Sequence, residues 1–185
     1  MKTRLVLFLL CLSLVFANTA LAKTVLPDAC GDDSVKFDVK TQKDQPPPGP
    51  PSAGKAQIVF IETLDRTWMC LGCGTPSTRF GVDGNWVGGN QGNSYFAIEV
   101  DPGVHHLCTG WQSVFGHLKQ MVGLDSFTAE AGKVYYYEAK ATLHVHSYGN
   151  NSRETDRSLD FTRLSEDEGK YRVKASELST FKPNK

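Results

Sequence analysis

Short apolar runs separated by turn residues recur along most of the chain. Lys55 to Glu62 contains four consecutive apolar residues, and Tyr95 to Val100 alternates large apolar side chains with smaller or polar ones. Runs of this length, rich in β-branched and aromatic residues and bounded by Gly, Pro and Asp, are typical of β-strands. About seven or eight of them at regular spacing predict a mainly β fold, a small antiparallel β-sandwich.

Three turn signals predict how the strands connect. The first, Asp83-Gly84, lies between two apolar runs and predicts a two-residue hairpin, because both turn residues need a positive φ. The second, Asp101-Pro102-Gly103, predicts antiparallel pairing of 95–100 with 104–113, and the third, Ala131-Gly132, predicts antiparallel pairing of 124–130 with 133–142. We expect the aspartates to bond within their own turns, and we assign these residues a structural rather than a catalytic role. The turn residues are Asp83, Gly84, Asp101, Pro102, Gly103 and Gly132.

The N-terminus has the order of a secretory signal peptide. Lys2 and Arg4 precede an apolar run, and a lighter stretch ends at Ala22, which predicts a signal peptide over residues 1–22. The apolar run is shorter than the roughly 20 residues of a membrane-spanning helix. We therefore expect an exported protein, periplasmic or extracellular, with no transmembrane segment in the mature chain.

The remaining chain divides by composition into three parts. Residues 23–44 form an N-terminal arm with one alternating stretch, Val35 to Val39, and residues 45–54 form a proline-rich spacer, expected to be extended. Residues 55–185 form the sandwich domain with a C-terminal extension, in which Ser165 to Glu168 has the form of a capping box and predicts a short helix. The stretches 89–94 and 149–156 are expected to be loops.

The charge of the mature chain argues against nucleic-acid binding. The whole chain has 20 basic and 20 acidic residues, and loss of Lys2 and Arg4 leaves an excess of two acidic residues. A protein that binds nucleic acid is expected to present a strongly basic face.

Four cysteines remain in the mature chain: Cys30, Cys70, Cys73 and Cys108. Two disulfides are the simplest reading in an exported protein, and four cysteines allow three pairings. Cys70 with Cys73 would close a small ring, and the pairing of Cys30 with Cys108 that remains would close a long loop, which we favour. A tetrahedral zinc site of Cys70, Cys73, His106 and Cys108, or redox chemistry at the Cys70-Leu71-Gly72-Cys73 motif, is the alternative.

Aromatic residues offer a further candidate site. Trp68, Trp86 and Tyr95 could form a platform on which a ligand such as a sugar ring stacks, whereas the alternative is that they pack within or beside the core. No recognisable hydrolase motif pairs a nucleophile with a base, and the glycines of 88–92 lack the Lys-Ser/Thr of a phosphate loop. No catalytic residue and no cofactor are predicted.

Four segments together carry a resemblance to known families. They are Gly81-Val82-Asp83-Gly84-Asn85-Trp86-Val87-Gly88, Gly92-Asn93-Ser94-Tyr95-Phe96, Asp101-Pro102-Gly103-Val104-His105-His106-Leu107-Cys108 and Ala129-Glu130-Ala131-Gly132-Lys133-Val134-Tyr135-Tyr136. Their order resembles an uncharacterised family of exported bacterial domains of unknown function and the more widespread PEGA-type surface modules. The resemblance implies a small transthyretin-like or PEGA-like β-sandwich on the cell-envelope side, with no established enzymatic activity and no catalytic residues.

These observations predict an exported, non-enzymatic envelope module. Its expected partner is an envelope protein or a surface polymer such as a polysaccharide, bound through strand edges and loops. The alternative is a periplasmic zinc- or redox-active protein that uses Cys70, Cys73, His106 and Cys108.

Overall fold

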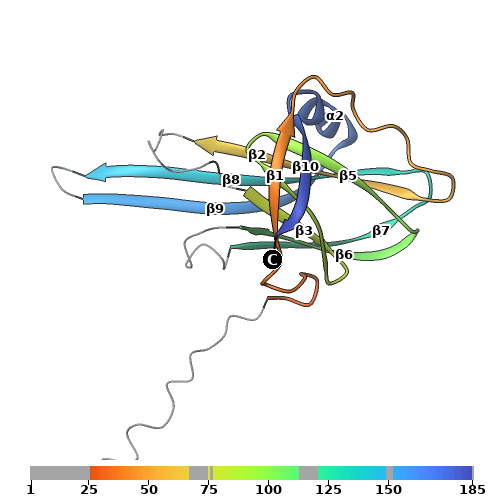
Figure 1. Cartoon of the computed structure of the whole chain (residues 1–185), viewed down its shortest axis with the longest axis horizontal. Helices are drawn as coiled ribbons and strands as arrows, with labels where there is room; N and C mark the ends of the chain where they lie inside the picture. Colours follow the sequence, from red (N-terminus) through yellow and green to blue (C-terminus); the bar gives the residue numbers. More distant parts are fainter. Residues whose placement is uncertain (1–25, 67–74, 76, 113–120, 149–151, 185) are drawn as a thin grey trace, which may run out of the picture.

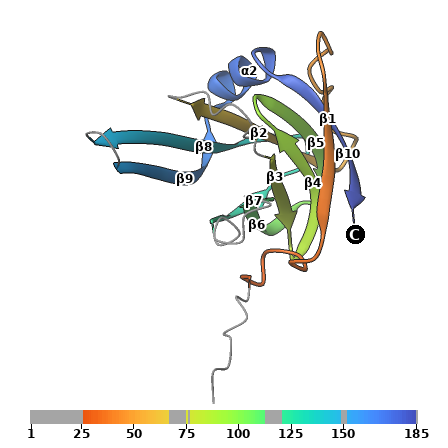
Figure 2. The same cartoon turned by 60° about the vertical axis from the view of Figure 1, so that its left-hand side comes forward.

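The fold is a β-sandwich of a six-stranded and a four-stranded sheet (Figures 1 and 2). The computed structural model describes residues 26–66, 75, 77–112, 121–148 and 152–184. The six-stranded sheet has the order β1 (Lys36–Gln42), β10 (Glu177–Asn184), β5 (Ser94–Val100), β2 (Ala56–Arg66), β8 (Val134–Tyr148) and β9 (Ser152–Leu164). The four-stranded sheet has the order β4 (Asn85–Gln91), β3 (Ser77–Val82), β6 (Gly103–Trp111) and β7 (Val122–Ala129).

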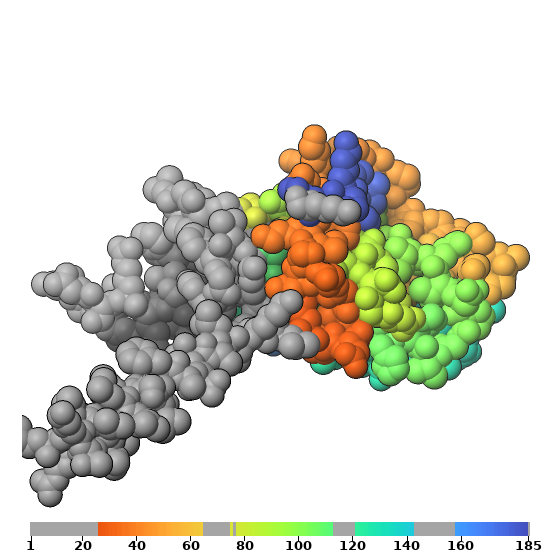
Figure 3. All heavy atoms as spheres, turned by 60° about the horizontal axis from the view of Figure 1, so that its bottom comes forward, coloured from red at the N-terminus to blue at the C-terminus, as the bar shows by residue number. Residues whose placement is uncertain are grey.

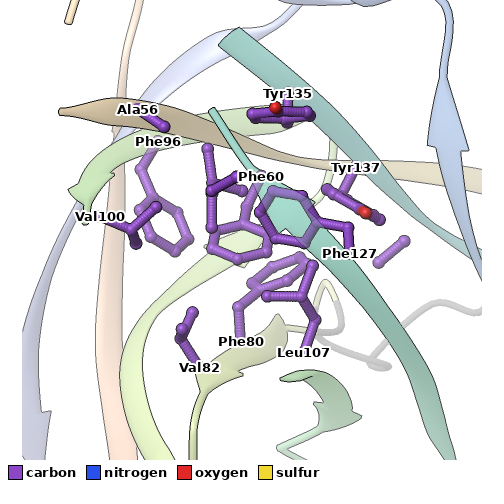
Figure 4. Packing of buried hydrophobic residues seen from close by; sticks show 13 residues of the cluster. Ala56, Phe60, Phe80, Val82, Phe96, Val100, Leu107, Phe127, Tyr135 and Tyr137 are labelled. Atoms are coloured by element: carbon purple, nitrogen blue, oxygen red, sulfur yellow. The ribbon is translucent and has the colours of Figure 1, made fainter. Parts of the chain in front are cut away.

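The main core fills the space between the two sheets. Aromatic rings dominate it, and Phe60 of β2 stacks on Phe80 of β3 at a centroid distance of 4.8 Å (Figure 4). A second apolar cluster lies on the other face of the six-stranded sheet, where Val59 and Tyr136 pack with Val173 of α2 (Glu166–Lys174). The centre of this sheet is therefore buried on both faces, which explains the unbroken apolar run in β2.

Several local predictions are confirmed. The Asp83-Gly84 turn joins β3 to β4, with φ of 49° at Asp83 and 80° at Gly84. Ser165 caps α2 by accepting a hydrogen bond from the backbone N–H of Glu168, as the capping box predicts. Within the described residues α2 is the single helix, and it is not long and apolar enough to cross a membrane.

The two other predicted hairpins are wrong. The turn at Asp101-Pro102-Gly103 connects β5 in one sheet to β6 in the other, and the turn at Gly132 connects β7 to β8 in the same way. In the six-stranded sheet, β2 lies between the two misassigned strands and pairs with β5 antiparallel and with β8 parallel, while in the other sheet β6 pairs with β7. The same turn residues reverse the chain whether the next strand pairs in the same sheet or crosses to the other sheet. They therefore predicted the reversal but not the strand with which each segment pairs.

The glycine-rich stretch 88–91 is strand rather than loop. It forms the end of β4, and a Cβ on Gly88 would collide with the rings of Phe181 and Phe96. Glycine is therefore needed for the close approach of β10. Likewise 152–156, predicted as part of a loop, has strand backbone and pairs with β8.

The arm and the sandwich share one sheet. The predicted strand in the arm is confirmed as β1, which pairs with the C-terminal strand β10, an element that the sequence did not predict. Between β1 and β2 the proline-rich spacer has no regular secondary structure, and Figure 1 shows it arching past α2. Before β1, residues 30–35 of the arm contact Arg79, Trp86 and Cys108 of the four-stranded sheet, whereas the spacer lies over the six-stranded sheet beside α2, so these two places are the candidate sites.

Candidate functional site

The arm is fastened to the outer face of the four-stranded sheet by a disulfide. Cys30 and Cys108 are bonded, with a Cα–Cα distance of 5.1 Å, and their exposed fractions are 6% and 0%. This confirms the favoured pairing of Cys30 with Cys108. A buried disulfide of this kind is compatible with an oxidising compartment.

A buried arginine provides the second attachment of the arm. The guanidinium of Arg79, a residue only 3% exposed, donates hydrogen bonds to the backbone carbonyls of Asp33 and Val35 and forms an ion pair of 2.7 Å with the Asp33 carboxylate. The same guanidinium lies 4.1 Å from the ring centroid of Trp86. The charge of Arg79 is thereby paired and hydrogen-bonded, as a buried charge requires.

Trp86 completes this attachment rather than forming a ligand platform. Its indole N–H donates to the backbone carbonyl of Asp32 at 2.9 Å, and Gly31 lies so close to the ring that a Cβ there would collide with it. In the space-filling view the arm, in orange, runs along the sheet residues coloured yellow-green (Figure 3). Because Arg79 and the arm pack against the ring of Trp86, these contacts take the place of a stacked ligand.

The predicted stacking platform is wrong at Tyr95 as well. Tyr95 is 2% exposed, and its hydroxyl donates to the carbonyl of Pro46 at 3.1 Å, so its ring offers no surface to a ligand. Burial raises the pKa of the Tyr95 hydroxyl. Trp68, the third member, lies outside the described residues.

The alternative zinc site lacks one of its four predicted ligands, the thiolate of Cys108. Cys108 is bonded to Cys30 and cannot supply a thiolate, while His106 is exposed and Cys108 is buried. Cys70 and Cys73 lie outside the described residues. In the ranges that the structure describes, no three His, Cys, Asp or Glu side chains are grouped to hold a metal ion.

The turn aspartates bind neighbouring segments instead of their own turns. Asp83 accepts from the backbone N–H of His106 and lies 2.6 Å from Nδ1 of His105, and Asp101 forms an ion pair with Lys55. The other ring nitrogen of His105 bonds the carbonyl of Asp101 at 2.8 Å. Both nitrogens of His105 are therefore engaged with groups of the protein itself.

One buried carboxyl, Glu62, is also held by the fold. Its oxygens accept from the backbone N–H groups of Thr78 and Gly92, and its exposed fraction is 0%. Burial raises the pKa of Glu62 well above its usual value. The carboxyl therefore links β2 to β3 and to the turn between β4 and β5.

On the opposite outer face, the proline-rich spacer is held at its ends. Near its start Tyr95 binds the carbonyl of Pro46, and beyond its middle the backbone N–H of Ser52 donates to Glu99 at 2.7 Å. From Pro47 to Pro50, no hydrogen bond ties the spacer to another described residue. The proline rings fix φ along this part, so the unsupported span keeps an extended form.

A groove of about 990 Å³ lies between the spacer, the six-stranded sheet and α2. The spacer contributes residues 47–50 to one wall, and α2 contributes Glu166, Lys170, Val173 and Lys174 to another. The sheet contributes Gln57 and Val59 of β2 and Val134 and Tyr136 of β8. A concave, mostly apolar site of this volume is the ordinary form of a ligand pocket.

Two polar groups in the groove have no partner. Gln57 is 8% exposed, yet its side-chain amide forms no hydrogen bond with any described residue. Tyr136 is 9% exposed, and its hydroxyl is likewise unpaired within the described part of the chain. Burial raises the pKa of the Tyr136 hydroxyl, and the nearby Lys170 acts in the opposite direction. The amide of Gln57 and the hydroxyl of Tyr136 therefore stay open to solvent in the groove, where a ligand can reach them.

Gln57 was not among the site residues predicted from the sequence. A signal was present, because Gln57 is the one polar residue between Ala56 and Ile61, in a strand predicted to be buried. A polar residue in such a run needs a partner or a ligand.

No protein-family model, curated protein or solved structure matches the chain. The resemblance to exported domains of unknown function and to PEGA-type modules therefore stays a prediction.

Proposed function

We propose that the protein is an exported, non-enzymatic module of the cell envelope that binds a partner in the groove beneath the proline-rich spacer. The proposal extends the prediction of a module that binds through edges and loops, because the spacer is the loop that forms the groove wall. The buried Cys30–Cys108 disulfide supports export, since such bonds persist in oxidising compartments.

One observation carries the proposal: the Gln57 side chain, whose amide has no hydrogen-bond partner in the described residues, lines a pocket of about 990 Å³ that is otherwise mainly apolar. An apolar pocket with a few unsatisfied polar groups has the composition of a binding site.

The position of Gly49 allows a steric test. Gly49 lines the groove, and a Cβ built there has nothing within 4 Å, so leucine can be placed at this lining position without a steric clash. Gly49→Leu is the blocking variant. Ala53→Leu is the matched control, because Ala53 is an exposed spacer residue that does not line the groove.

The experiment uses the mature protein and its two leucine variants as bait for envelope extract. A partner retained by the wild type is purified, and its Kd for each form is measured by calorimetry. We expect equal affinity for wild type and Ala53→Leu, and affinity at least about tenfold weaker for Gly49→Leu, a loss of about 1.4 kcal/mol. Equal binding to all three forms, or the absence of any retained partner, contradicts the proposal.

A further inference from the structure

We infer that the ligand of the groove is an extended peptide segment with apolar side chains. This inference rests on the proposed function and names the class of partner. Three properties of the groove separate a peptide from an acyl chain and from a polysaccharide: the open amide of Gln57, the hydrogen-bonding character of the spacer and the balance of charge at the rim.

The Gln57 side chain presents both a donor and an acceptor. A primary amide has an N–H group and a carbonyl side by side, which matches the C=O and N–H of a peptide backbone. An acyl chain has no group that could pair with this amide and would leave it buried and unsatisfied, at a cost in affinity. The open Gln57 amide therefore favours a ligand with backbone amides.

The spacer adds hydrogen-bond acceptors to the same groove. Pro47, Pro48 and Pro50 have no N–H, and no hydrogen bond from another described residue occupies their carbonyls. An extended peptide carries an N–H at nearly every residue, so it supplies the donors that this wall lacks. Recognition of extended segments by main-chain hydrogen bonds plus side-chain pockets is a general mode of peptide binding.

The floor of the groove fits the side chains of such a segment. Val59, Val134 and Val173 provide apolar surface below the spacer. In an extended peptide successive side chains point to opposite sides, so alternate residues can face this floor while the others face solvent. An apolar residue at every second position is thus the pattern that the groove selects.

The rim and the aromatic content argue against a polysaccharide. The groove has three basic residues and three acidic ones, so the site does not favour a charged polymer. They are Lys43, Lys170, Lys174, Asp44, Glu166 and Glu177. A sugar ring would need an exposed aromatic face, whereas the ring of Tyr136 is 9% exposed and Gly169 of α2 lies directly against it.

The test is selection from a random peptide library displayed on phage, with the folded mature protein as target. Selected peptides are synthesised with a fluorophore, and their Kd is measured by fluorescence polarisation for wild type, Gln57→Met, Gly49→Leu and Ala53→Leu. Methionine keeps the length of the Gln57 side chain and removes its hydrogen-bonding groups. Circular dichroism and thermal unfolding of each variant verify that the fold is retained.

We expect selected peptides with apolar residues at alternate positions. Their binding is weaker by about tenfold for Gln57→Met, the effect of losing hydrogen bonds to a buried amide, and by at least that factor for Gly49→Leu. Ala53→Leu binds as the wild type does. Peptides that bind all four forms equally, or a selection that yields no peptide, overturn the inference.

The same variants distinguish this failure from failure of the proposed function. The probes are dodecanoate and chitotetraose, which represent an acyl chain and a neutral sugar polymer. If one of them binds wild type and Ala53→Leu but not Gly49→Leu while no peptide does, the groove is a binding site and the peptide inference is wrong. If neither probe, no peptide and no envelope component binds in a manner that depends on Gly49, both proposals are wrong.

Discussion

The two outer faces of the sandwich are covered in different ways by neighbouring parts of the same N-terminal segment. On the four-stranded sheet, residues 30–33 of the arm are fixed by a disulfide, the Arg79 ion pair and the Trp86 hydrogen bond. On the six-stranded sheet, the spacer is fixed near its ends and leaves a groove with an unpaired amide.

This difference separates a structural covering from a binding site. Where the arm lies, the guanidinium of Arg79 and the indole N–H of Trp86 both bind backbone carbonyls of the arm, so the polar groups there serve folding. Where the spacer lies, the amide of Gln57 and the hydroxyl of Tyr136 have no partner in the described residues, so no hydrogen bond of theirs stabilises the fold. Removing the attachments of the arm should therefore lower the free energy of unfolding, whereas removing the Gln57 amide should not.

The largest effect is expected from the disulfide. Replacing both Cys30 and Cys108 by Ala removes a link between residues 78 apart, and the chain-entropy model predicts a loss of about 4 kcal/mol. Urea unfolding of the purified variant measures the loss. As a control, Cys70→Ala with Cys73→Ala should cost less, because any ring between those residues is small. A loss below about 1 kcal/mol for the Cys30 and Cys108 variant would show that the arm is not a structural covering.

The next effect concerns the buried arginine. Arg79→Met should lower the free energy of unfolding by about 3 kcal/mol, because it removes a buried ion pair and leaves the arm carbonyls unpaired. Arg79→Lys keeps the charge but not the forked donors, and it should cost less. Unfolding by guanidinium chloride measures both variants, and a stability of Arg79→Met equal to that of the wild type would count against the account.

A smaller effect on the arm-covered sheet depends on pH. Burial lowers the pKa of His105, but the Asp101 carbonyl and the Asp83 carboxylate outweigh it, and the pKa is raised overall. The stabilisation is fully present below the unfolded value of about 6.5 and is lost as the pH rises through the higher folded pKa.

The test compares urea unfolding of wild type and His105→Gln at several pH values. The wild type should lose stability relative to His105→Gln as the pH rises from about 6 to about 9. The turn that contains Asp83 also contacts the arm, because the backbone N–H of Gly84 donates to the carbonyl of Ala29. A constant difference between the two proteins across this range would mean that His105 does not hold the turn in its charged form.

The predictions from the sequence succeeded for features that depend only on neighbouring residues, such as a turn and a helix cap. Asp83-Gly84 needs two positive φ values, and Ser165 followed by Glu168 forms a cap, so both features follow from adjacent residues. The connections at Gly103 and Gly132 were misassigned as hairpins, because the choice of sheet depends on packing across the core. The C-terminal strand β10 escaped prediction because it contains few apolar residues and is held by β1 and β5.

The candidate site was harder to predict for a related reason. The groove exists because the spacer, β2, β8 and α2 meet, and these segments are distant in sequence. The aromatic residues that suggested a platform, Trp86 and Tyr95, became anchors of the arm and the spacer. Their sequence context could not distinguish a ring that binds a ligand from one that fastens a loop.

The most direct test of the contrast between the two faces is the free energy of unfolding of Gln57→Met. If the Gln57 amide is kept for a ligand, replacing it by an apolar side chain of similar length removes a polar group that has no partner in the described residues. Urea unfolding without ligand should then show a free energy of unfolding within about 0.5 kcal/mol of the wild-type value. A loss of about 1 kcal/mol or more would show that Gln57 serves the fold, and it would contradict the claim that the spacer-covered face is built to bind.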